Sequence, residues 1–372
     1  SGPMFVGHAH PDVTKAITEQ APQGTTFFAN NQYGIKLAEE ICEAMACADQ
    51  LRFVSSGSEA TLYAMRLARA YRKRDKILKF EGGYHGMSDY SLMSLAPTRL
   101  ANYPQALPDS AGIPKQVSNE VIIAPFNDIE TVKSLINEYH DELGGVIVEP
   151  FQRLIPPAPG FLEMLREITL KHEIPLIFDE IVTGFRFSYG GAQDYYGVTP
   201  DLCTLGKIIG GGFPVAAVCG QKEIMKHFDK ALVGEENFLP QIGTLSGNPL
   251  ASVAGLATLN ILKPASSYQK VFETGRQLME GLRAALQDNG HIAQITGEPA
   301  LFDVFFSEKK NKNYRDVLQS DTGKSKSFNQ LLRKQKIFKS DSKFYVSLAH
   351  TQDDIDLTIS AMNHAAKALK EL

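Results

Sequence analysis

The chain has 372 residues, of which 43% are hydrophobic, and its formal net charge is −4. This length and composition permit a sizeable core and two domains, while the slightly acidic balance provides no basic field for nucleic acid and no polybasic patch for a membrane surface. No apolar stretch reaches the roughly 18 residues that a membrane span requires.

Cysteine usage and the lack of a visible signal peptide favour a cytoplasmic protein. The four cysteines form no CxxC pair, and Cys203 and Cys219 lie in apolar runs. We interpret them as small core residues of a protein in a reducing compartment. The first residues, SGPM, need not be the start of the natural chain.

Residues 1–34 are expected to form an N-terminal segment ahead of the first clearly periodic helix. His8 and His10 lie near Gly and Pro, where histidines are usually plain turn residues. No third ligand has a spacing suitable for a metal, so we predict no metal site.

A strand, a small polar turn and a helix come next. Periodicity predicts a helix over 35–46, a strand over 51–54 and a helix over 61–74. Between the last two stand Ser56, Gly57 and Ser58. Such a helix start offers free backbone N–H groups and the positive end of the helix dipole to an anion. The alternative is an ordinary N-cap, because Ser before Glu is a common helix start.

The strand predicted over 76–80 leads through two glycines to Tyr84 and His85. An aromatic side chain at a strand exit can stack on a planar ring; the alternative is a half-buried loop aromatic. Residues 87–118 are spotted with Pro and Gly and poorly periodic, and a loop of this length inside a compact domain is often functional.

Polar groups follow a further strand, predicted over 145–149. They are Glu149 at its end and Gln152 just beyond. Arg153 is a candidate clamp for a substrate carboxylate, because a planar guanidinium binds that group bidentately. Arg186 is a second candidate, and a surface position is the alternative for both arginines.

Two buried strands, predicted over 175–178 and 201–205, are followed by Asp179 and Lys207. Open α/β sheets bind ligands outside the carboxyl ends of their strands, so both side chains belong at one rim. Desolvation there lowers the pKa of a lysine and makes it a competent Schiff-base nucleophile. An acid at the same rim can hold the ring nitrogen of pyridoxal phosphate. Either residue alone is more often simply exposed.

The alternation of strands and helices indicates an α/β protein with a largely parallel sheet in a large domain over 35–263. A plausible hinge at 264–267 leads into a smaller α+β domain over 264–372. The remaining predicted elements are strands over 121–125, 215–219, 300–306 and 344–348, helices over 128–140, 161–172, 222–228, 250–262, 268–289, 328–335 and 353–372, and a solvated charged run over 307–326.

Several motifs together resemble the class III aminotransferases, which are fold type I pyridoxal-phosphate enzymes, and in particular the glutamate-1-semialdehyde 2,1-aminomutase branch. These are FDEIVTGFR, TPDLCTLGKIIGGGFPVAA, SGSEA, YHG, the EPxQ string and GTLSGNP. Members of this family carry a further N-terminal stretch that is absent before residue 1 of this sequence.

The resemblance implies a role for each matching residue around pyridoxal 5'-phosphate. Lys207 would carry the internal aldimine and Asp179 would pair with the ring nitrogen. Val182 would lie against one face of the ring, and Tyr84 would cover the pyridine, with His85 close by.

Further roles are implied for residues at the edge of that site. Ser56, Gly57 and Ser58 would hold the phosphate. Gln152 would lie near the ring hydroxyl and Glu149 would brace the site. Thr244 would reach the cofactor phosphate of the partner subunit in a homodimer, so that each site is completed by its neighbour.

Two reactions are compatible with these motifs. We predict amino-group transfer between an amine or amino acid and an oxo acid, because Gln152 and the segment 97–114 depart from the aminomutase pattern. The alternative is internal transfer within glutamate-1-semialdehyde. A cofactor-binding regulator would carry a helix-turn-helix, which the sequence does not show, and a nucleotide-binding protein would carry a Walker A or GxGxxG motif, which is also missing.

Overall fold

The computed structural model of the protein describes residues 2–371. Its larger body is built on a seven-stranded sheet whose strands are, in spatial order, β1 (Gln50–Val54), β7 (Ala216–Gly220), β6 (Leu202–Leu205), β5 (Leu176–Asp179), β4 (Leu143–Val148), β2 (Lys76–Phe80) and β3 (Val121–Ala124). Strand β7 runs antiparallel to both of its neighbours, β1 and β6, and all the other strands of the sheet run in the same direction as one another. Strands β3 to β7 are buried along their whole length, as expected for a sheet covered on both faces.

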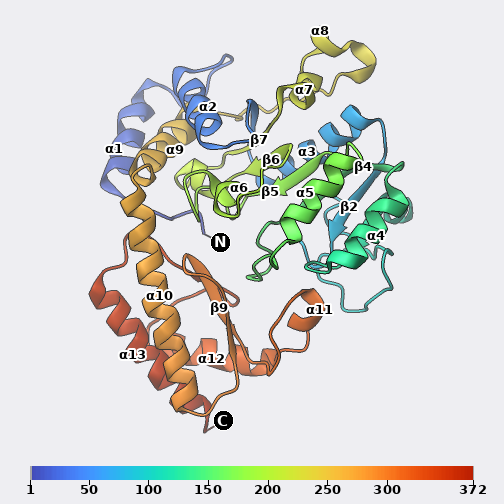
Figure 1. Ribbon diagram of the computed structural model, residues 1–372. Coiled ribbons are helices and arrows are strands. Elements are labelled where there is room, and N and C mark those ends of the chain that lie inside the picture. The colour runs from blue at the N-terminus through green and yellow to red at the C-terminus, as the bar shows by residue number, and fades with distance from the viewer. Residues whose placement is uncertain (1, 372) are drawn as a thin grey trace.

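Helices surround this sheet in Figure 1. They are α3 (Gly57–Arg72), α4 (Ile129–Tyr139), α5 (Phe161–Lys171), α6 (Gly191–Tyr195), α7 (Lys222–Met225) and α8 (Lys230–Val233). Short 3₁₀ turns complete the connections: η1 (Ala21–Gln23), η2 (Lys115–Glu120), η3 (Lys207–Gly210), η4 (Lys226–Phe228) and η5 (Glu235–Asn237).

The N-terminal segment contains a helix that the sequence analysis did not predict. Helix α1 (Pro11–Gln20) packs against α9 (Pro249–Leu262), which also contacts α2 (Gln32–Ala44). His10 is the N-cap of α1 and its ring accepts the Asp12 N–H at 3.3 Å. Because only two of its residues are buried, α1 has little apolar periodicity to reveal it.

The smaller body begins with α10 (Ala265–Asp288), which runs along one side of the molecule in Figure 1. It contains an antiparallel sheet and three more helices: β10 (Phe344–Tyr345), β9 (Leu301–Phe305), β8 (Gln294–Glu298), α11 (Tyr314–Val317), α12 (Thr322–Lys334) and α13 (Gln352–Leu369). We propose that the domain boundary lies at 263–264, between α9 and α10.

One local expectation for this body is wrong, and the hinge predicted at 264–267 stays a prediction. Residues 265–267 form the first turn of α10, with Pro264 as N-cap. The charged run over 307–326 is not a solvated loop, since it contains α11 and the start of α12. Tyr314 and Asn311 within it are buried. Burial against the larger body, which no local pattern reports, orders this run.

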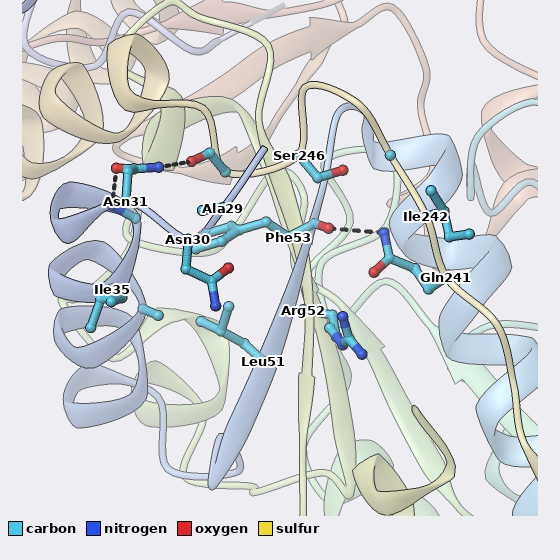
Figure 2. A pocket seen from close by; sticks show the side chains of 14 residues that line it. Ala29, Asn30, Asn31, Ile35, Leu51, Arg52, Phe53, Gln241, Ile242 and Ser246 are labelled. Carbon is cyan, nitrogen blue, oxygen red and sulfur yellow. Dashed lines mark hydrogen bonds between the residues drawn. The ribbon is translucent and has the colours of Figure 1, made fainter. Parts of the chain in front are cut away.

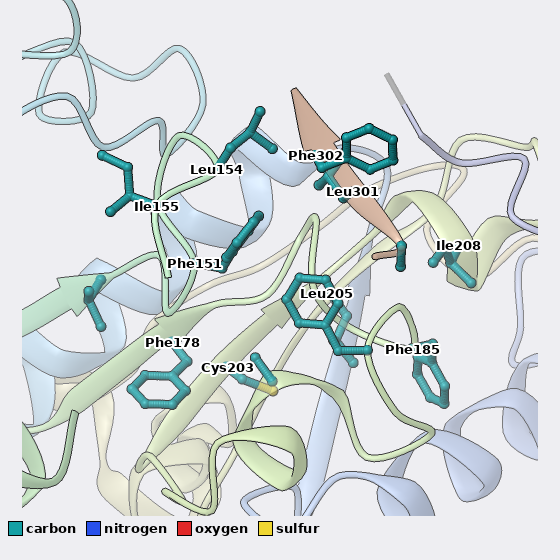
Figure 3. Packing of buried hydrophobic residues seen from close by; sticks show 14 of the residues in the cluster. Phe151, Leu154, Ile155, Phe178, Phe185, Cys203, Leu205, Ile208, Leu301 and Phe302 are labelled. Carbon is teal, nitrogen blue, oxygen red and sulfur yellow. The ribbon is translucent and has the colours of Figure 1, made fainter. Parts of the chain in front are cut away.

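A continuous hydrophobic core joins the two bodies. Leu301 and Phe302 of β9 belong to the same buried cluster as Phe185, Leu205 and Ile208, and Figure 3 places these side chains near one another. Cys203 pairs in register with Cys219 across β6 and β7, and both thiols are free and buried. None of the helices within residues 2–371 has both the length and the apolar character to cross a membrane.

Candidate active site

Asp179 and Lys207 lie at the ends of neighbouring parallel strands. Asp179 is the last residue of β5 and pairs in register with Thr204 of β6, and Lys207 opens η3 directly after β6. Lys207 has φ 47°, in the left-handed region that few residues with a side chain adopt. Backbone conformations of this kind cluster at functional sites.

The carboxylate of Asp179 is held by three hydrogen bonds. Oδ2 accepts from Nδ1 of His85 at 2.7 Å, and Oδ1 accepts from the Thr204 hydroxyl at 3.0 Å and the Ile181 N–H at 3.2 Å. Asp179 is 4% exposed and His85 1% exposed. Hydrogen bonds to an ionised group are the stronger kind, so this carboxylate has a fixed orientation.

The turn at the start of α3 leaves two backbone donors free. Ser56 is the N-cap in a capping box, and the Glu59 carboxylate accepts the N–H groups of Ser55 and Ser56, each at 2.8 Å. The N–H groups of Gly57 and Ser58 make no hydrogen bond with any described residue. Free N–H groups at a helix N-terminus are suited to binding an anion.

The loop that carries Tyr84 and His85 packs directly on this turn. The Ser58 hydroxyl accepts the Met87 N–H at 3.2 Å, and the Thr61 hydroxyl donates to the His85 carbonyl at 2.6 Å. A Cβ on Gly86 would lie only 2.6 Å from the Ser58 Cα. The contact therefore requires glycine at position 86.

Ile181 packs between the turn at the start of α3 and the turn before Lys207. An added Cβ at either Gly57 or Gly206 would lie 3.1 Å from Ile181 Cδ1. The start of α3, the residues after Asp179 and the turn before Lys207 therefore meet around one side chain.

Gln152 and His85 each leave a buried polar atom without a partner. The Gln152 amide donates to the Glu81 carbonyl at 2.8 Å, while its Oε1 has no hydrogen-bond partner among residues 2–371, and the same holds for His85 Nε2. Both orphan atoms lie close to Gly83: a Cβ there would be 3.0 Å from His85 Nε2 and 3.2 Å from Gln152 Oε1. Buried polar groups are normally paired, so these two atoms fit a site that binds a polar ligand.

The surroundings of Lys207 lower the pKa of its amine. Burial lowers the pKa of Lys207, against the opposing effect of Asp179, and the positive charges of Arg186 and Lys343 lower it further. Burial also raises the pKa of Glu149, whose Oε2 accepts the Tyr84 N–H at 2.9 Å.

The two candidate arginine clamps differ in what they contact. Arg153 donates to the carbonyls of Gly82 and Leu95, each at 2.6 Å, and its guanidinium lies 4.8 Å from the Tyr314 ring centroid. The Arg153 guanidinium therefore supports the loop before Tyr84. Arg186 is 1% exposed, donates through Nε to the Val182 carbonyl at 2.7 Å and lines a cavity.

Tyr84, Val182 and Thr244 are the remaining candidates. Tyr84 is 48% exposed and Val182 is half-buried. Thr244 is exposed, and no described hydrogen bond joins it to the other candidate residues of the same chain. It lies in the segment 238–248, beside the pocket of Figure 2, where Gln241 donates to the Phe53 carbonyl at 3.2 Å.

Sequence reasoning missed Thr204, Ile181 and Lys343 as parts of this site. Thr204 could have been found, because pairing β5 with β6 in register sets it opposite Asp179. Lys343 had no local signal, since it reaches the site only through the docking of the smaller body.

Comparisons with known proteins agree with this geometry. The family model for class III aminotransferases matches residues 2–365. A glutamate-1-semialdehyde 2,1-aminomutase 2 of Brevibacillus brevis is 43% identical over 98% of this chain and 85% of its own length.

Solved structures show the same likeness. An omega-transaminase from Sphaerobacter thermophilus is 35% identical, with a TM-score of 0.94 over 100% of this chain and 86% of its own. A beta-phenylalanine aminotransferase from Variovorax paradoxus is 30% identical, with a TM-score of 0.86 over 97% of this chain and 80% of its own.

These matches confirm the predicted fold type I architecture and the predicted cofactor, pyridoxal phosphate. The family model spans nearly the whole chain, and the relatives are similar over most of their own length. The chain therefore belongs to the class III aminotransferases.

Proposed function

We propose that this enzyme transfers an amino group between an amine or amino acid and an oxo acid, with Lys207 as its reactive lysine. One observation carries the proposal: Lys207, a half-buried lysine whose pKa is lowered, and a fixed carboxylate, Asp179, stand at the ends of adjacent parallel strands. That pair supplies a nucleophilic amine and a partner for a protonated ring nitrogen.

The residues around this pair fit pyridoxal phosphate. The free N–H groups of Gly57 and Ser58, with the hydroxyl of Ser58, would hold its phosphate, whereas the Ser56 hydroxyl donates to Glu59 Oε2 at 3.2 Å. The orphan atoms of His85 and Gln152 offer polar contacts that the protein itself leaves unused. When bound, the cofactor supplies an aldehyde that condenses with amines and a ring that accepts electrons from the substrate.

The chain's own residues would then do four things. Lys207 Nζ, whose pKa is lowered by desolvation, would take a proton from the substrate carbon that bears the amino group and return it elsewhere. Asp179, fixed by His85 and Thr204, would keep its negative charge aimed at the ring nitrogen. Tyr84 and Val182 would orient the ring, and Glu149 would hold the Tyr84 backbone.

Internal transfer within glutamate-1-semialdehyde is the second candidate function, and the 43% identity to the Brevibacillus aminomutase favours it. The purified enzyme can be supplied with the semialdehyde alone, without any oxo acid. Sustained turnover under that condition would favour the aminomutase. Turnover that requires an oxo acid, measured over a panel of amino donors through the cofactor's absorbance, is the result that our proposal predicts.

We also propose that the enzyme acts as a homodimer. Ile35 and Ile242, which line the pocket of Figure 2, are more than half exposed, and so is Leu245, which follows Thr244 in sequence. Exposed apolar patches mark interaction sites. A second copy of the chain would cover these side chains and bring its Thr244 to the neighbouring phosphate site.

A further inference from the structure

Glu180, the residue after Asp179, is a buried carboxylate whose role the sequence motifs leave open. Its side chain is 0% exposed, and within residues 2–371 no nitrogen of a lysine, arginine or histidine side chain lies within 4.0 Å of it. Burying a charge without a cation is costly, and burial raises the pKa of this carboxyl although its hydrogen bonds oppose the rise. An ion pair therefore does not explain an acid at this position.

Four donors surround the Glu180 carboxylate, and all of them belong to the segment 183–193. Oε2 accepts the Ala192 N–H at 2.5 Å and the Thr183 hydroxyl at 3.1 Å. Oε1 accepts the Gln193 N–H at 3.2 Å and the Gln193 side-chain amide at 3.0 Å. Because Thr183 begins this segment and Gln193 ends it, the carboxylate closes residues 180–193 into a loop.

Two glycines allow the loop to close. Gly191 has φ +73°, and a Cβ there would lie only 2.5 Å from Glu180 Oε2. A Cβ on Gly184 would lie 2.5 Å from Leu205 Cδ2, so the loop also packs directly on β6. A side chain at either position would therefore displace the loop from the carboxylate or from the sheet.

Gln193 connects the end of this loop to the residues after α2. Its Oε1 accepts the Cys47 N–H at 3.0 Å, and its Nε2 lies 3.7 Å from Met45 Sδ. Gln193, Met45 and Cys47 are all buried. The Glu180 carboxylate and the Gln193 amide thus form a buried polar pair with partners on both sides, and a fully satisfied network of this kind fixes one arrangement of the groups that it joins.

The closed loop carries Val182, which the proposed function sets against the cofactor ring. The Ile181 N–H, just before Val182, donates to Asp179 Oδ1 at 3.2 Å. The Gly184 N–H, just after it, donates to the Glu180 carbonyl at 2.8 Å. The backbone on both sides of Val182 is therefore held by the two acids that end β5.

We propose that Glu180 is a positioning residue: with Gln193 it holds Val182 against one face of the cofactor ring and so fixes the orientation of that ring. The inference rests on the proposed function and adds to it a pair of residues to which no motif gave a role. Glu180 itself touches neither cofactor nor substrate in this account, because its carboxylate is enclosed by the loop.

The test compares the wild type with Glu180→Gln, Gln193→Glu and the double variant that exchanges the two side chains. Each apoenzyme is titrated with pyridoxal phosphate to give its Kd. The visible circular dichroism of the saturated enzyme then reports how firmly the ring is oriented. The matched control is Asp201→Asn: Asp201 is also a buried carboxylate, but it accepts the Leu176 N–H at 2.7 Å at the opposite ends of β5 and β6 from Lys207.

We expect Glu180→Gln to raise the Kd for pyridoxal phosphate by about tenfold and to weaken the circular dichroism, because one amide oxygen cannot serve all four donors and hydrogen bonds to charged groups contribute about this much. Gln193→Glu should act similarly, since it places two carboxylates together. The double variant restores one carboxylate and one amide, so its Kd should return to within about threefold of the wild-type value. Asp201→Asn should lower the free energy of unfolding and change neither the Kd nor the circular dichroism.

A folded Glu180→Gln with wild-type Kd and circular dichroism would overturn the role of Glu180, and so would a double variant that binds the cofactor no better than the single ones. Thr183→Val, which removes one donor, decides the question should Glu180→Gln not fold: wild-type values for it would also overturn the inference. None of these readouts depends on turnover. A wild type that binds the cofactor but transaminates no donor with any oxo acid would instead overturn the proposed function.

Discussion

Two lysines of the larger body, the buried Lys79 and the half-buried Lys207, are used in different ways. Lys79, 1% exposed in β2, donates to the carbonyls of Ser91 and Met93 at 2.8 and 2.6 Å. Lys207 makes no hydrogen bond with a described residue, although burial lowers its pKa as well. Lys79 thus anchors the long loop after Tyr84, whereas Lys207 keeps its amine available for reaction.

The anchoring lysine gives a pH-dependent prediction. Burial lowers the pKa of Lys79 to about 7, and an unfolded lysine titrates near about 10.4. Between these values the unfolded chain binds a proton that the folded chain does not, so this residue makes the free energy of unfolding rise with pH, by at most about 1.4 kcal/mol per unit. The stability of wild type relative to Lys79→Met should therefore increase from pH 7 to pH 10 in urea titrations.

The exposed Lys334 supplies the control for this prediction, because Lys334→Met should give a pH profile parallel to that of the wild type. Parallel profiles for Lys79→Met and the wild type would contradict the account, since Lys79 would then keep an ordinary pKa in the folded protein.

The sequence could predict the position of candidate residues that directly follow predicted strands. Asp179 and Lys207 follow short buried strands, and parallel pairing brings such strand ends together. Arg153 was predicted as a carboxylate clamp from its chemistry alone, but its fork binds two loop carbonyls. The contacts of such a side chain depend on how the loops fold over the sheet. The residue type alone does not predict these contacts.

At the scale of elements, the short helix α11 docks the smaller body onto the loop that carries Tyr84 and His85. Arg315 forms a bidentate pair with the Glu81 carboxylate at 2.7 and 3.0 Å, and the Tyr103 hydroxyl donates to the same carboxylate at 2.8 Å. Gly82, with φ +83°, leaves room for Tyr314, which a Cβ there would approach to 2.7 Å. The contact is therefore specific in both charge and shape.

Removing Arg315 should destabilise this docking. Glu81 is 4% exposed, and a buried carboxylate left without its partner is strongly unfavourable. We expect Arg315→Ala to lower the free energy of unfolding by about 2–3 kcal/mol, discounting for the partial exposure of the arginine. Equilibrium urea titrations measure this, with Arg333→Ala as the matched control.

Arg333 also pairs with an aspartate of the smaller body, but both partners are exposed, so its removal should change stability by about 1 kcal/mol or less. Equal effects of the two substitutions would mean that the Arg315 pair contributes no more than a surface ion pair.

Element prediction succeeded where periodicity is strong and failed where tertiary contact decides. All seven strands of the large sheet were anticipated, because short apolar runs are typical of buried strands. Helix α1 and the ordered part of 307–326 were missed. The first buries only one apolar residue, Val13, and the second is ordered by Tyr314 and Arg315, which contact residues more than 200 positions away.

At the scale of the whole molecule, the position of Thr244 bears on the proposed homodimer. Thr244 is exposed beside apolar side chains on a surface that is distinct from the cavity near Arg186. In a dimer with two-fold symmetry the same patch on each copy faces its equivalent, so each Thr244 can serve the other copy's site.

Hybrid dimers test this exchange. Lys207→Ala removes the reactive amine, and Thr244→Glu would repel a phosphate by its charge, so each variant alone should have little activity. When they are mixed after subunit exchange, a hybrid contains one intact site, formed by Lys207 of one subunit and Thr244 of the other. Mixing equal amounts should restore roughly a quarter of wild-type activity, because half of the dimers are hybrids.

No recovery despite demonstrated subunit exchange would indicate that Thr244 acts within its own chain or not at all. A protein that sediments as a monomer and is fully active would also contradict the dimer proposal.

The most direct test of the central claim is to identify the lysine that binds the cofactor. The enzyme is incubated with pyridoxal phosphate, reduced with borohydride to make the link permanent, digested, and mapped by mass spectrometry. Our account predicts the modification on Lys207 and on neither Lys79 nor Lys343, together with loss of the visible absorbance of the lysine-bound cofactor in Lys207→Ala. Stoichiometric modification of another lysine, or an unmodified and active enzyme, would contradict it.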